Sequence, residues 1–210
     1  FTFIRQMSII TKMQNIPKQT RSKLRIQKII EAAEKILLEE GIDNITIARI
    51  ADVSGLKRTS TYKFFPTIHS LKLEMSNIYI SACKKHFVSK TENIRTNNLS
   101  VIVLRCVEIL YMYFEDHIEA QKIILSNEFN PSIDSKKFQE LSLAIQSFVD
   151  LNINLPKMFN KDGVYRVFTQ IIISIFSLNV KENNALDEVG KIEAHRAGYA
   201  YLLSWTTKNS

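Results

Sequence analysis

Residues 55–67, GLKRTSTYKFFPT, concentrate side chains that carry positive charge or donate hydrogen bonds. The segment holds two lysines, an arginine, several hydroxyl groups and two adjacent phenylalanines, but no acid, and the nearest carboxylates are Asp52 and Glu74. Cations and hydroxyls without competing carboxylates bind phosphates, and some of them reach base edges. The chemistry that these residue types favour is therefore recognition of a polyanion.

The distribution of charge along the chain agrees with this interpretation. The chain has 210 residues and a net charge of +7, and the part up to Lys72 holds 13 of the 28 bases but only 6 of the 21 acids. That part carries the whole excess, and the remainder is neutral. Such asymmetry indicates a polyanion-binding module joined to a neutral one, and the alternative is a solvated basic face without a partner.

Composition limits the fold class and the compartment. Glycine (5) and proline (4) are scarce and 45% of the residues are hydrophobic, so we expect a soluble, all-α chain. Cys83 and Cys106 are expected to be buried, unpaired thiols of a reducing compartment. The N-terminus does not resemble a signal peptide, and the most apolar run, 171–178, is far shorter than the ~20 residues of a membrane span. We therefore expect a cytoplasmic protein without a membrane segment.

Helices must position the cationic segment. Apolar residues recur at three- and four-residue spacing over 22–40, which predicts a helix with one buried face. Thr46 is a natural N-cap for a short helix over 46–54, Gly55 ends that helix, and a second short helix fits 57–64. Two short helices joined by a glycine-containing turn behind a longer helix form a helix-turn-helix, whose second helix enters the major groove.

The rest of the chain is also predicted to be helical. The predicted helices cover residues 68–90, 99–116, 118–128, 135–155, 163–181 and 186–205, with a loop at 129–134.

Over residues 22–73 the chain resembles the DNA-binding domain of the TetR family of bacterial transcriptional repressors. The stretches that carry the resemblance are IIEAAEKILLEEG and TIARIADVSGLKRTSTYKFFPT, with matches at Gly55, Tyr62, Phe64, Phe65, Pro66 and Thr67. The resemblance implies an all-α fold with a three-helix helix-turn-helix domain (21–67), preceded by a poorly ordered extension (1–20). It also implies a C-terminal helical domain for effector binding and dimerisation (68–210).

The resemblance implies contacts with DNA position by position. Thr46 is similar to the family's phosphate-binding threonine and Tyr62 to its phosphate-contacting tyrosine, while the start of the recognition helix is expected to read bases. The implied DNA-binding residues are Thr46, Lys57, Arg58, Thr59, Ser60, Tyr62 and Lys63. Arg25 and Arg49 are further candidate phosphate contacts. The alternative for the whole face is a solvated cationic helix.

Three positions of the recognition helix depart from the family pattern. Lys57 stands where a capping serine is common, Thr61 stands where an inward-packing leucine is usual, and Phe64 replaces a histidine or tyrosine. We therefore expect a poorly capped helix start at Lys57.

The C-terminal helices carry the other implied sites. The resemblance implies an effector pocket lined by Tyr79, Cys83, Cys106, Leu110, Tyr113, Phe114 and His117, and core packing is the alternative for each of these. Residues 167–180, VFTQIIISIFSLNV, are apolar on nearly every face and must be buried all round, in part by self-association. The implied two-fold dimer interface contains Phe168, Ile172, Ile175, Phe176, Tyr201, Leu202 and Trp205.

The main hypothesis is a dimeric transcriptional regulator, a repressor that a small-molecule effector releases from a palindromic operator. The alternative is a DNA-binding protein of the same fold that has no such effector and answers to a protein partner. A small-molecule-processing enzyme is a third hypothesis, but the sequence has no glycine-rich phosphate loop, metal-ligand cluster or catalytic-triad spacing. We expect no catalytic residues, no metal and no cofactor, and the expected partners are double-stranded DNA, a second copy and an unidentified effector.

Overall fold

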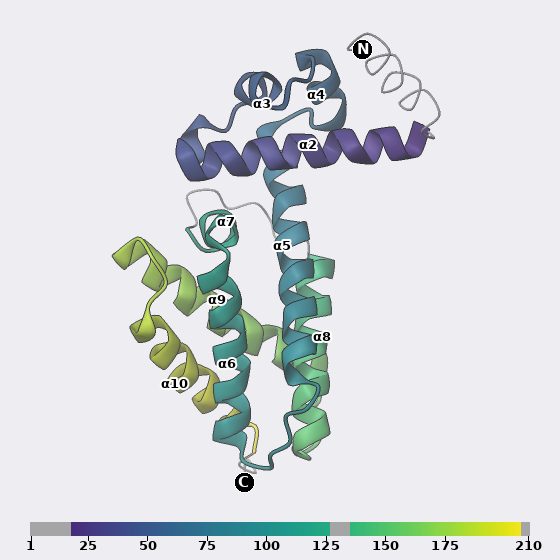
Figure 1. Cartoon of the computed structure of the whole chain (residues 1–210). Helices are drawn as coiled ribbons and strands as arrows, with labels where there is room; N and C mark the ends of the chain where they lie inside the picture. Colours follow the sequence, from purple (N-terminus) through teal and green to yellow (C-terminus); the bar gives the residue numbers. More distant parts are fainter. Residues whose placement is uncertain (1–17, 127–134, 207–210) are drawn as a thin grey trace, which may run out of the picture. The chain divides into compact units, whose positions relative to one another are not determined.

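The computed structural model describes residues 18–126 and 135–206, and in these ranges all regular structure is helical (Figure 1). The expected all-α fold is confirmed. The chain divides into two compact units between Leu71 and Lys72. Residues 1–17 of the predicted extension and the predicted loop at 129–134 lie outside the described residues.

The first unit is built around a long helix and two short ones. It contains α2 (Lys18–Glu39), the 3₁₀ turn η1 (Ile42–Asn44), α3 (Ile47–Ser54) and α4 (Arg58–Phe64). Helix α2 starts four residues before the predicted boundary, and η1 is a turn that the pattern of apolar residues did not predict. The apolar residues at helical spacing form one core: Ile29, Ala33, Ile36, Leu37, Ile47, Ile50 and Ala51. This core fixes the short helices against α2, because burying apolar side chains is the main favourable term in folding.

The second unit is a bundle of longer helices. It contains most of α5 (Ile68–Thr91), with α6 (Leu99–Asp116), α7 (Ile118–Ala120), the π-helix η2 (Gln121–Leu125), α8 (Ser135–Asn152), α9 (Lys161–Asn183) and α10 (Glu188–Ser204). Helices α5, α6 and α8 run alongside one another (Figure 1), and the rings of Phe87 and Phe148 meet at 5.9 Å between α5 and α8. Helix α9 packs against α8 and α10, and α10 packs against α6.

The predicted α-helix at 118–128 is replaced by α7 and the π-helix, and its last two residues lie outside the described ranges. The side chain of Gln121 donates to the carbonyl of Phe114 at 2.8 Å and accepts from the backbone N–H of Leu186 at 3.2 Å. The Ser177 hydroxyl donates to the Leu125 carbonyl. Two of these three bonds join residues more than 50 positions apart in sequence, so local helix propensity could not reveal the change of helix type.

Candidate nucleic-acid interface and effector site

The turn between α3 and α4 depends on a side-chain cap and a glycine. Thr46 caps α3 by accepting a hydrogen bond from the backbone N–H of Arg49 at 3.1 Å, as the sequence predicts. Gly55 has φ 68° and ψ 17°, the left-handed conformation that ends α3. Only glycine adopts this conformation without a steric penalty from its own Cβ. The glycine therefore sets the direction in which α4 leaves the turn.

Helix α4 exposes the predicted DNA-binding side chains and buries its other face. Lys57, Arg58, Thr59 and Lys63 are exposed, Tyr62 is 52% exposed and Ser60 is half-buried. Thr61 is fully buried and Phe65 is almost fully buried. The threonine therefore occupies the inward position where the family pattern has leucine. The first turn has no side-chain cap, because Lys57 offers only its backbone carbonyl.

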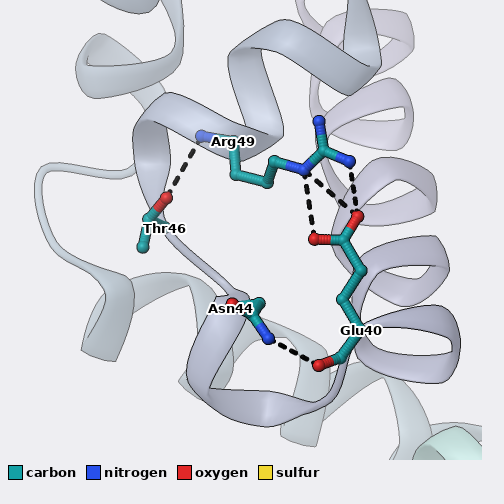
Figure 2. A network of polar contacts seen from close by, with 4 residues as sticks. All are labelled: Glu40, Asn44, Thr46 and Arg49. Atoms are coloured by element: carbon teal, nitrogen blue, oxygen red, sulfur yellow. Dashed lines mark hydrogen bonds and ion pairs between the residues drawn. The ribbon is translucent and has the colours of Figure 1, made fainter.

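In the same unit, Arg49 and Glu40 join α3 to the end of α2 (Figure 2). Arg49 Nε lies 3.1 Å from both carboxylate oxygens of Glu40, and Nη2 lies 2.5 Å from Oε1. The side chain of Asn44 donates to the backbone carbonyl of Glu40, one of the carbonyls left open at the helix end. The hydrogen bond from Arg49 lowers the pKa of Glu40 below its ordinary value. Arg49, a candidate phosphate contact from the sequence, thus already has a carboxylate partner.

The cations of the α4 surface differ in their partners. Arg58 Nη2 lies 3.8 Å from Oδ1 of Asp52, and both side chains are more than half exposed. In the part of the chain that the structure describes, Lys57 and Lys63 have no carboxylate partner. A helix face with two uncompensated ammonium groups, one guanidinium and several hydroxyls can hold phosphate oxygens and offer donors to base edges.

Most of the residues predicted to line an effector pocket lie together in the core of the second unit. Cys83, Cys106, Leu110 and Phe114 are fully buried, and Tyr79 and Tyr113 nearly so. Burial raises the pKa of both thiols well above the ordinary range, which keeps them neutral.

Tyr113 lies at the centre of a polar cluster between α5 and α6. Its hydroxyl donates to the Tyr79 carbonyl at 2.8 Å. The half-buried His117 donates from Nδ1 to the Tyr113 carbonyl at 2.7 Å and stacks on the Tyr113 ring at 4.4 Å. The ring of His86 also contacts Tyr113, with the two ring centroids 5.8 Å apart. Since a carbonyl only accepts, Nδ1 of His117 carries the proton, and its Nε2 can accept when the ring is neutral.

Four polar groups that sequence reasoning missed also lie inside the second unit. Among the described residues, the buried side-chain atoms without a hydrogen-bond partner are Asn77 Oδ1, His86 Nε2, Gln146 Oε1 and the Tyr165 hydroxyl. Tyr165 is fully buried, and burial lowers the pKa of His86 below its ordinary value, which favours the neutral ring. Buried polar atoms normally have partners, so such a group in a native core calls for an explanation. In the sequence, the available signal was a polar side chain at a position where the helical spacing predicts an apolar one.

Helix α9 has two apolar faces with different environments. Phe168, Ile172 and Phe176 are fully buried inside the chain, and Leu202 of α10 is too. These four were predicted at a dimer interface, but the chain's own core covers them. A segment that is apolar all round gives no indication of which face the same chain covers.

Other apolar residues of α9 and α10 remain on the surface of the single chain. Those of α9 are Val167 (43% exposed) and Leu178 (55%), with Ile171 and Ile175 half-buried between them. Those of α10 and its end are Val189, Ile192, Leu203 and Trp205, and the predicted Tyr201 is half-buried beside them. We call these nine residues the α9–α10 apolar surface. Length and composition alone would also allow α9 to cross a membrane, but 56% of its most apolar window is buried within the chain, as in a core helix.

Comparisons with known proteins identify the fold. No protein-family model matches the chain, and no curated protein matches its sequence. A crystal structure of a TetR-family transcriptional regulator from Streptomyces coelicolor matches with a TM-score of 0.67 and 14% identity, covering 86% of this chain and 99% of that one. A TetR transcriptional regulator from Rhodococcus sp. RHA1 matches with a TM-score of 0.63 and 11% identity, over 92% and 100% of the two chains.

A third structure carries a ligand. It is Thermus thermophilus FadR, a TetR-family transcriptional repressor in complex with lauroyl-CoA, with a TM-score of 0.63 and 12% identity over 88% and 96% of the chains. The matches cover nearly the full length of each known structure, whereas the sequence resemblance covers residues 22–73 alone. Both units together therefore have the fold of the TetR-family transcriptional regulators.

Proposed function

We propose that this protein is a transcriptional regulator that binds double-stranded DNA through α4. The observation that carries the proposal is the exposed face of α4, where Lys57, Arg58, Thr59, Tyr62 and Lys63 stand free of carboxylates except for Asp52. Cationic and hydroxyl donors on a short helix behind a tight turn suit insertion into the major groove. Thr46, at the start of α3, is exposed and has a hydroxyl for a flanking phosphate.

The active form is proposed to be a homodimer in the cytoplasm. The α9–α10 apolar surface is the support for this, because exposed apolar side chains gathered on two neighbouring helices favour association. A two-fold dimer presents two copies of α4 to a palindromic site whose half-sites are about 34 Å apart. The interface predicted from the sequence is thereby revised: Ile175, Tyr201 and Trp205 stay in it, and Val167, Ile171 and Leu178 replace the core residues.

The regulation that we propose is release from DNA when a small molecule binds inside the second unit. The unpartnered atoms of Tyr165 and His86 support an effector with a largely apolar body and a hydrogen-bonding group, since such a ligand would satisfy donors and acceptors that the core leaves open. The lauroyl-CoA complex of the Thermus protein is a precedent in the same fold. Release follows if the ligand binds better to a state that does not fit the operator. We assign no catalytic role to any residue.

Selection of bound fragments from a genomic DNA pool tests the proposal. The wild-type protein is expected to enrich a palindromic sequence, with affinity that falls steeply as salt rises. Arg58→Ala and Lys63→Ala should each weaken binding to the enriched sequence by roughly tenfold. Lys85→Ala, an exposed lysine of α5, is the matched control and should have no effect. Equal affinity of all four proteins for the enriched DNA would contradict the assignment of α4.

A further inference from the structure

The acid-free segment at 55–67 gains a carboxylate neighbour when the chain folds. Asp52 lies on α3, and the Gly55 turn carries α4 back so that Arg58 Nη2 stands 3.8 Å from Asp52 Oδ1. The side chain of Asp52 is 58% exposed and that of Arg58 is 61% exposed, so the pair lies on the solvent face of the unit. An acid therefore borders the surface for which we propose DNA binding.

Neither folding stability nor affinity for DNA accounts for this acid. Isolated, solvent-exposed ion pairs contribute little to the stability of a protein. A carboxylate close to a phosphate backbone is repelled by it, which weakens binding to every sequence. A residue that adds little stability and lowers general affinity suits a role in discriminating between sequences, because specificity is a difference between affinities.

Of the two arginines near Asp52, only Arg58 forms an ion pair with it. Arg49 lies one helical turn before Asp52 on α3, but its guanidinium is held by the carboxylate of Glu40 through Nε and Nη2 (Figure 2). The pKa of Arg49 is raised first by its hydrogen bond to Glu40 and only in smaller part by the charge of Asp52. Glu40 thus satisfies Arg49, and Arg58 is the cation that forms the ion pair with Asp52.

We propose that Asp52 is a positioning residue that directs Arg58 to a guanine edge and away from the phosphate backbone, an inference that rests on the proposed DNA-binding function. A guanidinium has five N–H donors in a rigid plane. The ion pair places Asp52 beside Nη2, 3.8 Å away, and leaves the donors of that plane for O6 and N7 of a guanine in the major groove, which are the acceptors arginine recognises best. The same carboxylate repels a phosphate, so it disfavours the competing, sequence-independent position of Arg58.

The experiment compares base preferences of variants by selecting bound DNA from a random pool. Asp52→Asn keeps the shape of the side chain and removes its charge, and Arg58→Ala identifies the base pair that Arg58 reads. Asp43→Asn, at an exposed acid of η1 in the same unit, makes the same change of net charge away from α4. Melting temperatures of all variants establish that they fold, and Asp52→Ser is measured in parallel.

We expect Asp52→Asn and Asp52→Ser to lower the preference for guanine by about tenfold at the base pair whose preference Arg58→Ala removes. Non-specific binding should rise in both variants. Asp43→Asn should leave that preference unchanged. In the Arg58→Ala background, Asp52→Asn should have no further effect on preference, because Asp52 acts through Arg58.

Two results would overturn the inference. One is a wild-type base preference in both Asp52 variants, with the same general rise in affinity that Asp43→Asn produces, which would make Asp52 an ordinary surface charge. The other is an undiminished effect of Asp52→Asn in the Arg58→Ala background, which would show that Asp52 acts without Arg58. The failure of the proposed function itself looks different, since the wild-type protein would then enrich no sequence at all.

Discussion

Arg49 binds both carboxylate oxygens of Glu40 and so links α3 to the end of α2. This contact accounts for an acid at the C-terminal end of α2, where the helix dipole disfavours negative charge. The arginine supplies the compensation that the helix itself does not. The pair thereby positions α3 and the turn that follows it.

The Glu40–Arg49 pair predicts a pH dependence of stability. The folded-state pKa of Glu40 is lowered, so its contribution is fully present above the ordinary pKa of 4.5 and is lost as the pH falls below it. We expect Glu40→Gln to lower the melting temperature by at most a few degrees at pH 7 and to flatten the acid limb of the profile. Thermal unfolding between pH 3 and 7 measures both, with the exposed neighbour Glu39→Gln as control. A wild-type acid limb in Glu40→Gln would contradict the assignment.

Gly55→Ala is predicted to destabilise the first unit by about 1 kcal/mol, because an alanine pays a steric penalty at positive φ. The φ of Gly55 is +68°, and nothing lies within 4 Å of an added Cβ, so backbone strain is the expected cause. Gly55→Asn should cost less, since asparagine tolerates this conformation. Urea unfolding followed by circular dichroism gives the free energies. Equal losses in the two variants would point to a cause other than backbone conformation.

Tyr165→Phe and Tyr113→Phe are predicted to have opposite effects on stability. The first removes a buried hydroxyl that has no partner among the described residues, and it should raise the free energy of unfolding by about 1 kcal/mol. The second removes a hydroxyl that donates to the Tyr79 carbonyl and should lower it by a similar amount. Chemical denaturation of the two variants side by side is the measurement, and a loss of stability in Tyr165→Phe would show that its hydroxyl is satisfied in the folded protein.

Leu178→Glu is predicted to convert the proposed dimer to a monomer without unfolding the chain. Leu178 is 55% exposed on the α9–α10 apolar surface, so a glutamate is tolerated in the single chain but is buried unpaired in an interface. Sedimentation velocity at several concentrations gives the oligomeric state. Val88→Glu, at an exposed position of α5 outside that surface, is the matched control and should remain dimeric. A Leu178→Glu protein that stays dimeric would place the interface elsewhere.

Several features could be predicted from the sequence because they depend on neighbours along the chain. Helix caps and turn glycines act over a few residues, so Thr46 and Gly55 were identified correctly. Helix α6 has the predicted bounds, Leu99–Asp116, because apolar spacing reports a helix directly. The excess charge of residues 1–72 and the cationic composition of α4 are likewise properties of the sequence alone.

Only the tertiary structure decided which chemically suitable residues meet. Periodicity showed that residues 167–180 are apolar, but packing of α9 against α8 and α10 determined that Phe168 is buried and Leu178 exposed. Glu40 at the end of α2 contacts Arg49 of α3, and the Gly55 turn brings Asp52 beside Arg58. Tyr165 is fully buried, and within residues 18–126 and 135–206 its hydroxyl has no hydrogen-bond partner. Long-range packing sets these relationships, and spacing along one helix carries no information about them.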